Sequence, residues 1–224
     1  RGSRKPKSKM GGHLTPLTRV KISVASTKTI DQITEVETIE SFRKIKEDLY
    51  LLSKATYMTE LAENFVQEHS ESKQIFNLLL QCITLLQIAP DIEMLVKFFE
   101  IKLMSQTGFK PEMVICSECG TTLLPGSYKF SFESGGLLCN QCTQKIHSFT
   151  EKLSTNSIKL IRFIQNENFA KIAKLNSTKN LLEEIERVIS GYLKSILDKE
   201  LKSKPFLDLI AKQTKNSITS KNIL

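Results

Sequence analysis

The sequence predicts an α+β fold that is mostly helical, and three observations lead to that prediction. Residues 17–42 contain alternating apolar and polar side chains, which is the period of a β-strand. From residue 43 onward, apolar residues recur every three to five positions, close to the period of a helix. Two pairs of cysteines interrupt the helical pattern between residues 116 and 142. We therefore expect strands first, helices over most of the chain, and a small inserted unit around the cysteines.

Two strands are predicted before residue 43. In "LTRVKISVAS", Val20, Ile22 and Val24 point to one side, whereas Arg19 and Lys21 point to the other. The segment "TIDQITEVETIESF" is rich in β-branched residues and favours a second strand. Two strands alone are marginally stable in water, so they need partner strands or a helical layer. The basic residues on one face indicate that the solvent side of this sheet faces phosphate.

Three helices are predicted before the cysteines. The first begins near residue 43, and its apolar face comprises Ile45, Leu49, Leu52, Thr56, Leu61 and Phe65. A second covers residues 73–88 and ends before Pro90. A third follows the N-cap residue Asp91 and ends at Thr107, just before Gly108. We expect five of their side chains, in addition to the apolar face above, to lie in the core as ordinary hydrophobes: Cys82, Met94, Phe98, Phe99 and Met104.

The cysteine segment and the end of the chain contain the remaining elements. Tyr128, Phe130 and Phe132 alternate as in a short strand. "NSIKLIRFIQ" predicts a short helix, and "STKNLLEEIERVISGYLKSILDKEL" predicts a long one that is capped by Ser177 and stopped by Pro205. The apolar stripe of the long helix is Leu182, Ile185, Val188, Ile189, Tyr192, Leu193 and Ile196. The final residues are polar and are expected to fray.

The four clustered cysteines predict a metal site. Cys116, Cys119, Cys139 and Cys142 form two C-x-x-C pairs that are separated by nineteen residues, a spacing found in zinc-binding modules. Two tight turns, each presenting two thiolates, complete a tetrahedron around one ion. Four ligands leave no open coordination position, so we predict one structural zinc ion per chain. Redox-active or unpaired thiols and disulfides are the alternatives, and His147 is either a substitute ligand or a surface residue.

The positive charge is concentrated at the two ends of the chain. The net charge is +8, and residues 1–30 contain eight basic side chains and no acid. Such a segment attracts phosphates by counterion release, although a solvated basic tail is the simpler alternative. No apolar run approaches the ~18 residues that span a bilayer, and no apolar segment follows the basic start as in a secretory signal. We expect a protein of the reducing cytoplasm.

Motifs of the common enzyme classes are absent from the sequence. We find no G-x-x-x-x-G-K-[ST], G-x-G-x-x-G, H-E-x-x-H or G-x-S-x-G pattern. His13, His69 and His147 do not cluster, and the acidic pairs Glu47-Asp48 and Glu183-Glu184 are expected to be solvated surface. A metal-dependent nuclease would need an open metal site or clustered carboxylates. We therefore predict a protein that is not an enzyme and has no small-molecule substrate.

Five blocks of sequence together resemble the bacterial RecO family, the recombination mediators of DNA repair. In order, they are "RKPKSKMGGHLTPLTRVKISV", "ETIESFRKIKEDL", "FEIKLMSQTGFKPEMVICSECG", "FSFESGGLLC" and "ELKSKPFLDLI". The resemblance implies an N-terminal OB-fold, and then a helical domain with an inserted zinc finger. It also implies binding of single- and double-stranded DNA, strand annealing, and loading of RecA with RecR on DNA coated by single-strand-binding protein (SSB). The family engages the acidic tail of SSB.

The chain departs from the family pattern in three places. It begins without Met at the "RKPKSK" loop, whereas family members have further strands before it, so we expect only the last strands of a truncated OB-fold. Phe132 stands where the family usually has proline, which affects a turn and no ligand. Some family members lack the four cysteines, but where they are present the family binds zinc structurally.

The resemblance suggests a division of the chain. We expect a partial OB-fold with a basic DNA-binding segment over residues 1–42, an α-helical domain over 43–212 with a zinc finger at about 113–147, and a flexible tail over 213–224. Phosphates would be contacted by Arg1, Arg4, Lys5, Lys7, Lys9, Arg19 and Lys21. The alternative is a helical adaptor that binds RecR and the SSB tail, at residues the sequence does not indicate, with little DNA binding of its own.

Overall fold

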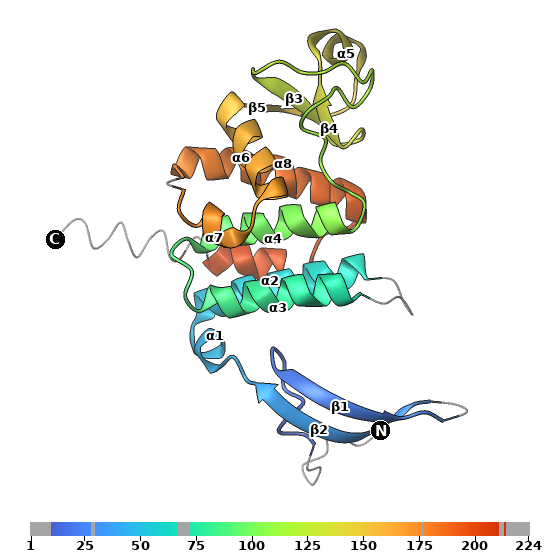
Figure 1. Ribbon diagram of the computed structural model, residues 1–224, viewed down its shortest axis with the longest axis vertical. Coiled ribbons are helices and arrows are strands. Elements are labelled where there is room, and N and C mark those ends of the chain that lie inside the picture. The colour runs from blue at the N-terminus through green and yellow to red at the C-terminus, as the bar shows by residue number, and fades with distance from the viewer. Residues whose placement is uncertain (1–9, 28–29, 67–71, 176, 211–212, 214–224) are drawn as a thin grey trace, which may run out of the picture.

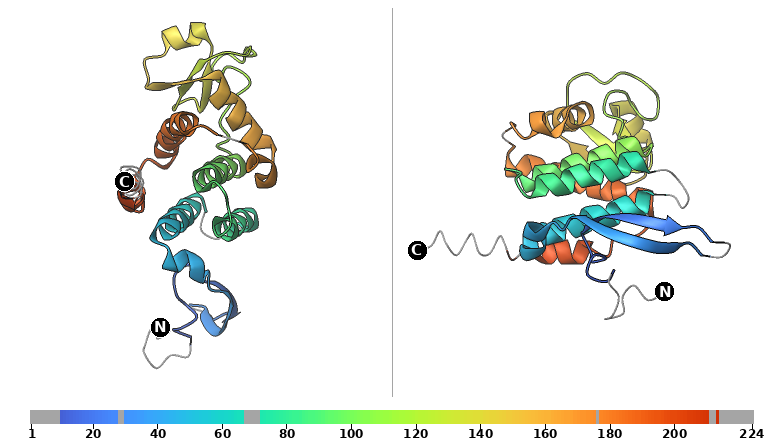
Figure 2. Two further views of the ribbon diagram at one scale, coloured as in Figure 1. Left: turned by 90° about the vertical axis from the view of Figure 1, so that its left-hand side faces the viewer. Right: turned by 60° about the horizontal axis from the view of Figure 1, so that its bottom comes forward.

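The computed structural model describes residues 10–27, 30–66, 72–175, 177–210 and 213. The described chain is mostly helical and contains two small sheets. A two-stranded ribbon lies at one end of the molecule, the helices form the middle, and the cysteine-containing unit lies at the other end (Figure 1, Figure 2). The predicted α+β class is therefore confirmed in its coarse form. A closed OB-fold barrel is not seen in the described residues.

The ribbon comprises β1 (Arg19–Ala25) and β2 (Gln32–Glu40), which pair antiparallel. Both predicted strands are therefore confirmed. No other described element covers the apolar face of the ribbon, because Ile22 and Val24 are 46% and 50% exposed. The expected burial of the apolar face is thus not observed. At the base of the ribbon, the Lys46 ammonium donates to the hydroxyl of Thr18, the residue before β1, at 2.7 Å.

The helix predicted from residue 43 is broken into α1 (Arg43–Glu47) and α2 (Leu49–Phe65). Asp48 between them has an extended backbone, and its carboxylate accepts hydrogen bonds from the backbone N–H groups of the next helix at 2.9 and 3.1 Å. Asp48 therefore caps a new helix rather than continuing the old one. Of the predicted apolar face, Ile45 and Leu61 are buried, whereas Leu49 and Thr56 are exposed.

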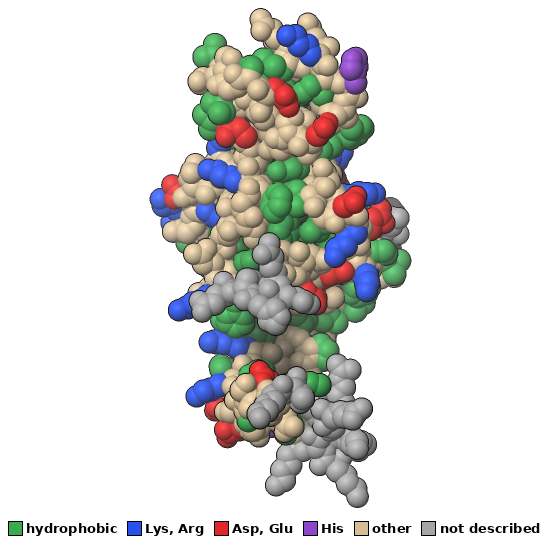
Figure 3. Space-filling view, turned by 90° about the vertical axis from the view of Figure 1, so that its right-hand side faces the viewer, with side chains coloured by type: hydrophobic (Ala, Val, Ile, Leu, Met, Phe, Trp, Pro, Cys, Tyr) green, Lys and Arg blue, Asp and Glu red, His purple; other side chains and the backbone are tan. Residues whose placement is uncertain are grey.

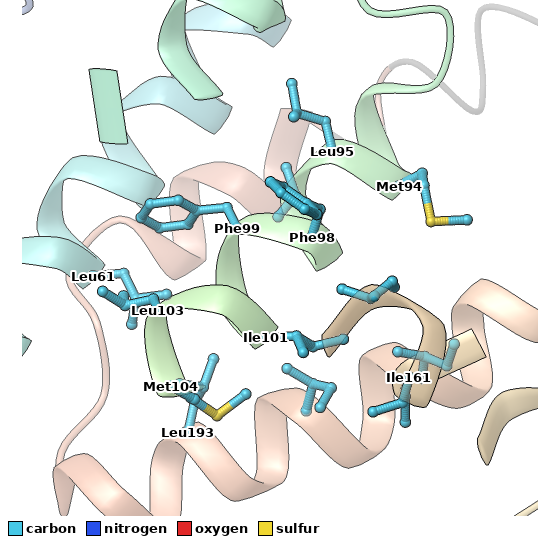
Figure 4. Packing of buried hydrophobic residues seen from close by; sticks show 14 of the residues in the cluster. Leu61, Met94, Leu95, Phe98, Phe99, Ile101, Leu103, Met104, Ile161 and Leu193 are labelled. Atoms are coloured by element: carbon cyan, nitrogen blue, oxygen red, sulfur yellow. The ribbon is translucent and has the colours of Figure 1, made fainter. Parts of the chain in front are cut away.

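Helices α3 (Lys73–Leu86) and α4 (Ile92–Gln106) confirm the second and third predicted helices. Asp91 caps α4 by accepting from the Met94 N–H at 2.9 Å, and Gly108 follows its end with a φ of 89°, a conformation that favours glycine. Helix α4 lies at the centre of the molecule, between α2, α3, α6, α7 and α8. Figure 4 shows its apolar side chains pointing outward to several helices at once. The predicted core residues Cys82, Met94, Phe98, Phe99 and Met104 are all buried.

The segment after α4 forms a separate small unit, and we call residues 113–153 the finger. It contains β3 (Tyr128–Ser131), β4 (Gly136–Leu138), α5 (Asn140–Lys145) and β5 (Thr150–Leu153). The sheet order is β4-β3-β5, and both pairs are antiparallel. Strand β3 confirms the predicted short strand at Tyr128 and Phe130, but it ends at Ser131, one residue before Phe132. The sequence did not indicate α5 or β5.

Helices α6 (Thr155–Asn166), α7 (Phe169–Ile172) and α8 (Lys179–Leu197) follow the finger. The predicted stripe of α8 is confirmed, because Ile185, Val188, Ile189, Tyr192 and Leu193 are buried. Two boundaries were wrong. Thr178 rather than Ser177 caps α8, and α8 ends where Asp198 adopts a φ of 48°. Pro205 instead lies in the first turn of a further helical stretch at residues 204–210, where a missing N–H costs nothing.

A network of buried charges joins these helices. Lys97 and Glu100 of α4 are 3% and 1% exposed and form an ion pair. Lys97 also pairs with Glu186 of α8, which binds Lys204 at 2.8 Å, and the Tyr57 hydroxyl donates to Glu100 at 2.6 Å. Burial opposes the charge on Lys97, but the two glutamates outweigh it and raise its pKa, whereas burial raises the pKa of Glu100. Removing one member of such a buried ion pair leaves an uncompensated charge in the interior and destabilises the fold.

Candidate functional site

The four predicted ligand cysteines converge in the finger. Their sulfur atoms all lie within 4.8 Å of one another, and the Sγ atoms of Cys119 and Cys139 are 3.8 Å apart. Four sulfurs at about 2.3 Å from a zinc ion form a tetrahedron with edges of about 3.8 Å. The spacing therefore fits a tetrahedral metal, and it is nearly twice the length of a disulfide bond, with all five cysteines free.

The first cysteine pair is held by a tight turn. The Gly120 N–H donates to the Cys116 carbonyl at 2.9 Å, and the Cys116 N–H donates to the Thr121 carbonyl at 2.8 Å. Gly120 has a φ of 71°, which a side chain would disfavour. Cys116 lies buried inside this turn, and Cys119 lies on its exposed outer side.

The second cysteine pair is held by the start of α5. Cys139 is the N-cap of this helix, and its sulfur accepts from the Cys142 N–H at 3.5 Å. The Cys139 N–H in turn donates to the Cys116 sulfur at 3.3 Å. Backbone N–H groups thus point at the sulfurs from both halves of the site, an arrangement that stabilises thiolates.

Contacts within the cluster shift the pKa values of three of the thiols in different directions. A hydrogen bond with the Thr121 hydroxyl, 3.3 Å away, lowers the pKa of Cys119 to about 6. Burial opposes ionisation of Cys116, but backbone N–H groups outweigh it and lower its pKa. The neighbouring Cys139 sulfur raises the pKa of Cys142 to about 12. A bound metal ion would take all four groups as thiolates and displace the remaining protons.

The site has the chemistry of a structural metal centre. Four sulfur ligands leave no position for water or substrate. His147 is exposed and is not one of the clustered ligands. Within the described part of the chain, no other group of three or more His, Cys, Asp or Glu side chains converges in this way. The described residues thus bring together no second cluster with the composition of a metal-dependent active site.

Helices clamp both stems of the finger. On the entry stem, Arg162 of α6 donates through Nε to the Met113 carbonyl at 2.7 Å, and Gln165 donates to the Pro111 carbonyl at 2.8 Å. On the exit stem, Glu184 of α8 accepts from the Ser154 and Ser157 hydroxyls at 2.9 and 2.8 Å. Glu184 was expected to be solvated surface, and that expectation was wrong because it binds the N-cap residue Ser154 and the first turn of α6.

The predicted phosphate-binding residues are only partly described. Arg1, Arg4, Lys5, Lys7 and Lys9 lie outside the described residues. Arg19 and Lys21 lie on β1, where each faces an acid of β2 across the ribbon: Arg19 pairs in register with Glu40, and Lys21 with Glu37.

The ribbon is therefore mixed in charge, a feature that sequence reasoning missed. Directly opposed residues of an antiparallel pair lie on the same face, so these acids reduce the local positive potential. The acids are visible in "TEVETIE", but only the register places them beside the basic residues. Figure 3 likewise shows acidic and basic side chains interspersed over one face of the molecule.

Comparison with known proteins identifies the family. The sequence model described as "Recombination protein O C terminal" matches residues 46–205. A protein of Dehalococcoides mccartyi named DNA repair protein RecO is 36% identical over 209 residues, which is 93% of this chain and 82% of that protein. The chain belongs to the RecO family. RecO proteins of Symbiobacterium thermophilum and Roseiflexus sp. are 30% and 27% identical over 94% and 97% of this chain, and the matches cover 84% and 76% of those proteins.

Family membership confirms the resemblance inferred from the five sequence blocks. The family match spans the helices and the whole finger, so the cysteine cluster lies within it. In the described residues, no helix combines the length and the apolar character that crossing a membrane requires.

Proposed function

We propose that this RecO-family chain is a non-enzymatic, DNA-binding mediator of recombination and DNA repair that acts in the cytoplasm. The supporting observation is its similarity, over most of its length, to proteins named DNA repair protein RecO. In this proposal it binds single- and double-stranded DNA, anneals strands, and helps RecR load RecA on SSB-coated DNA. The net charge of +8 and the acid-free residues 1–30 favour such a partner.

The proposed DNA interface consists of the partial OB-fold ribbon and the basic segment before it. Contacts to phosphates position a strand and do not read its sequence, so binding should be independent of sequence. The acids of β2 oppose part of this attraction. We therefore expect the ribbon to contribute less to DNA affinity than its basic residues alone would.

The ribbon interface is tested by paired charge substitutions. In Arg19→Gln/Lys21→Gln, two phosphate contacts are lost, so the slope of log affinity against log salt should fall by about 1.4 for single-stranded DNA. In Glu37→Gln/Glu40→Gln, the same face loses two acids, so affinity should rise. Fluorescence anisotropy over a salt series measures both changes. Binding without salt dependence in the wild-type protein would refute the electrostatic account.

We propose that Cys116, Cys119, Cys139 and Cys142 bind one structural zinc ion per chain. The fit between the sulfur spacing and a zinc tetrahedron supports this proposal. Elemental analysis should find one zinc per chain in the wild-type protein and less in Cys116→Ser or Cys139→Ser, because three ligands bind more weakly than four. Cys82→Ala is the matched control, since this buried thiol lies in α3 outside the cluster and its loss should leave zinc content unchanged.

A second candidate function, an adaptor for the acidic SSB tail, is favoured by a pocket of about 350 Å³ beside α8. Leu193, Leu197 and Leu201 form apolar parts of its wall, and Lys194 and Lys199 lie at the same pocket. An acidic peptide with an apolar end suits an apolar slot beside cations. The sequence did not indicate this pocket, because it forms only where the chain turns back after α8.

Peptide binding distinguishes the adaptor from the DNA-binding candidate. Lys199→Glu should weaken binding of an acidic SSB-tail peptide, because it places a like charge at the pocket. Lys179→Glu is the matched control, since Lys179 is also an exposed lysine of α8 but lies at the opposite end of the helix. Equal effects of both changes, or no peptide binding by the wild-type protein, would remove this candidate.

A further inference from the structure

Two phenylalanine rings are stacked at the edge of the finger, where it meets α8. The rings of Phe132 and Phe149 have centroids 5.5 Å apart and an interplanar angle of 17°. Phe149 is 70% exposed, whereas Phe132 is half-buried and packs against the buried ring of Phe130. Single exposed apolar residues are common on protein surfaces, but a supported, nearly parallel pair of rings is a more specific arrangement.

The inner ring of this pair is fixed by α8. A Cβ atom at Gly191 would lie 2.7 Å from the Cζ of Phe132, so the ring rests directly on the glycine. The Ser195 hydroxyl also donates to the Phe132 carbonyl at 3.2 Å. Strand β5, which follows Phe149, contacts α8 as well. The stack is therefore held in place, and the free surface of Phe149 faces solvent.

Cations lie on α8 on both sides of the stack. Arg187 is one turn before Gly191 and Lys194 one turn after it, so both share its side of the helix. They are about 10 Å apart along the axis, the length of about three stacked nucleotides. Arg187 is exposed and forms no ion pair with another described residue. Lys194 pairs with Glu200 at 2.7 Å, but both side chains are exposed, and such pairs are weak enough to exchange for a phosphate.

Two acids limit the direction in which a nucleic-acid strand can cross this surface. Glu133 is exposed directly after Phe132, and Glu151 lies on β5 opposite Phe130, on the sheet face that carries the stack. A polyanion that followed the sheet would meet both carboxylates. A polyanion that followed α8 would instead meet Arg187 and Lys194, with the Phe149 ring between them.

We propose that this surface is a second contact for single-stranded DNA, with one base stacked on Phe149 and the flanking phosphates at Arg187 and Lys194. Stacking on an aromatic ring is available to unpaired bases of any type, whereas bases in a duplex are already stacked on their neighbours. The ribbon lacks such a partner, since residues 1–41 contain no aromatic side chain. This inference rests on the proposed DNA-binding function and adds the part of it that distinguishes single strands from duplexes.

Phe149→Leu in the full chain tests the stacking. It keeps an apolar side chain but removes the ring, so affinity for single-stranded DNA should fall by about five- to tenfold, the lower end of the range for one base stack. Affinity for duplex DNA should change by less than about twofold. Phe76→Leu is the matched control, because Phe76 is also an exposed phenylalanine, 54% accessible on α3, and its loss should leave both affinities unchanged. Arg187→Gln should lower the salt slope for single strands by about 0.7.

Cross-linking the unmodified protein provides a second measurement that does not depend on how a variant folds. Irradiation of a complex with an oligonucleotide containing 5-iododeoxyuridine should attach the base to Phe149, as mapped by mass spectrometry. Three results would overturn the inference. The first is cross-linking confined to other residues, and the second is an equal loss of single-strand and duplex binding in Phe149→Leu. The third is that Phe149→Leu loses binding of the SSB tail and not of single-stranded DNA. If Arg19→Gln/Lys21→Gln weakens binding and Phe149→Leu does not, only this inference fails; if the wild-type protein binds no DNA, the proposed function fails.

Discussion

Replacing Lys97 with methionine would leave a buried carboxylate without its main cation. Glu100 would keep the hydrogen bond from the Tyr57 hydroxyl, and Glu186 would keep its ion pair with Lys204. Glu100 is 1% exposed, so burial favours its neutral form and it is expected to take up a proton in the folded variant. In the unfolded chain, the same group ionises with a pKa near 4.5.

The size of the effect follows from this difference. Holding Glu100 protonated at pH 7 costs about 3 kcal/mol, from about 2.5 pH units at 1.36 kcal/mol each. That agrees with the roughly 3–5 kcal/mol measured when one partner of a buried ion pair is removed. Because the folded pKa lies above the unfolded one, the penalty grows as the pH rises above 4.5 and disappears as the pH falls toward it.

Urea denaturation of Lys97→Met at pH 5 and pH 7 measures this penalty. The loss in the free energy of unfolding should be about 3 kcal/mol at pH 7 and below about 1 kcal/mol at pH 5. Lys97→Met/Glu100→Gln should recover most of the loss at pH 7, because the amide needs no proton. Lys54→Met is the control: Lys54 is equally buried, but its partner Glu93 is 45% exposed and can be hydrated.

Two results would refute this reasoning. One is a loss in Lys97→Met that is the same at both pH values, because it would mean that lost packing rather than an uncompensated charge sets the penalty. The other is a double variant that is no more stable at pH 7 than the single one. Either result would show that Glu100 finds another cation or water when Lys97 is removed.

Three further predictions concern the finger and the C-terminal stretch. Chelation of the proposed metal should lower the melting temperature and leave the helical circular dichroism largely intact, since metal binding is coupled to folding of the finger alone. Glu60→Gln should lower the free energy of unfolding in urea denaturation by about 1–3 kcal/mol, because the Glu60 carboxylate accepts hydrogen bonds from the backbone N–H and the hydroxyl of Ser203. These hydrogen bonds lower the pKa of Glu60. In the wild-type protein, their contribution to stability should therefore be lost as the pH falls below about 4.5. Gly135→Ala should lower the melting temperature more than Gly120→Ala does. Both glycines have left-handed backbones, but of the two only Gly135 would place a Cβ against another residue, 2.4 Å from the Tyr192 hydroxyl. Equal losses in the two variants would contradict this prediction.

Long periodic elements were predictable from the sequence, and short ones were not. Helices α3, α4 and α8 are long and have regularly spaced apolar residues, and α4 and α8 also have local side-chain caps, so their formation depends on residues that are close in sequence. Strand β5 has only four residues, "TEKL", and is defined by its pairing with β3. The break at Asp48 was missed because an acid within a helical pattern resembles solvated surface until its N–H partners are known.

The candidate site shows the same division. The approach of the four cysteines was predictable, because each pair closes a turn of a few residues. The acids opposite Arg19 and Lys21 were not, since strand register depends on contacts between residues about twenty positions apart. The pocket beside α8 was missed for a related reason. The pocket forms because the chain reverses at Asp198, which has a left-handed backbone. Glycine is the usual sequence signal for such a turn, and here the position is an aspartate.

The clamped stems of the finger have a consequence for the order of folding. The bonds from Arg162, Gln165 and Glu184 join the stems to α6 and α8, and none of them involves a cysteine. The helices can therefore assemble with the finger still an open loop, and the entropy of closing such a loop rises only slowly with its length. We expect a refolding intermediate in which the amides of α4 are protected from hydrogen exchange before those of β3. Addition of zinc would then accelerate only the last step.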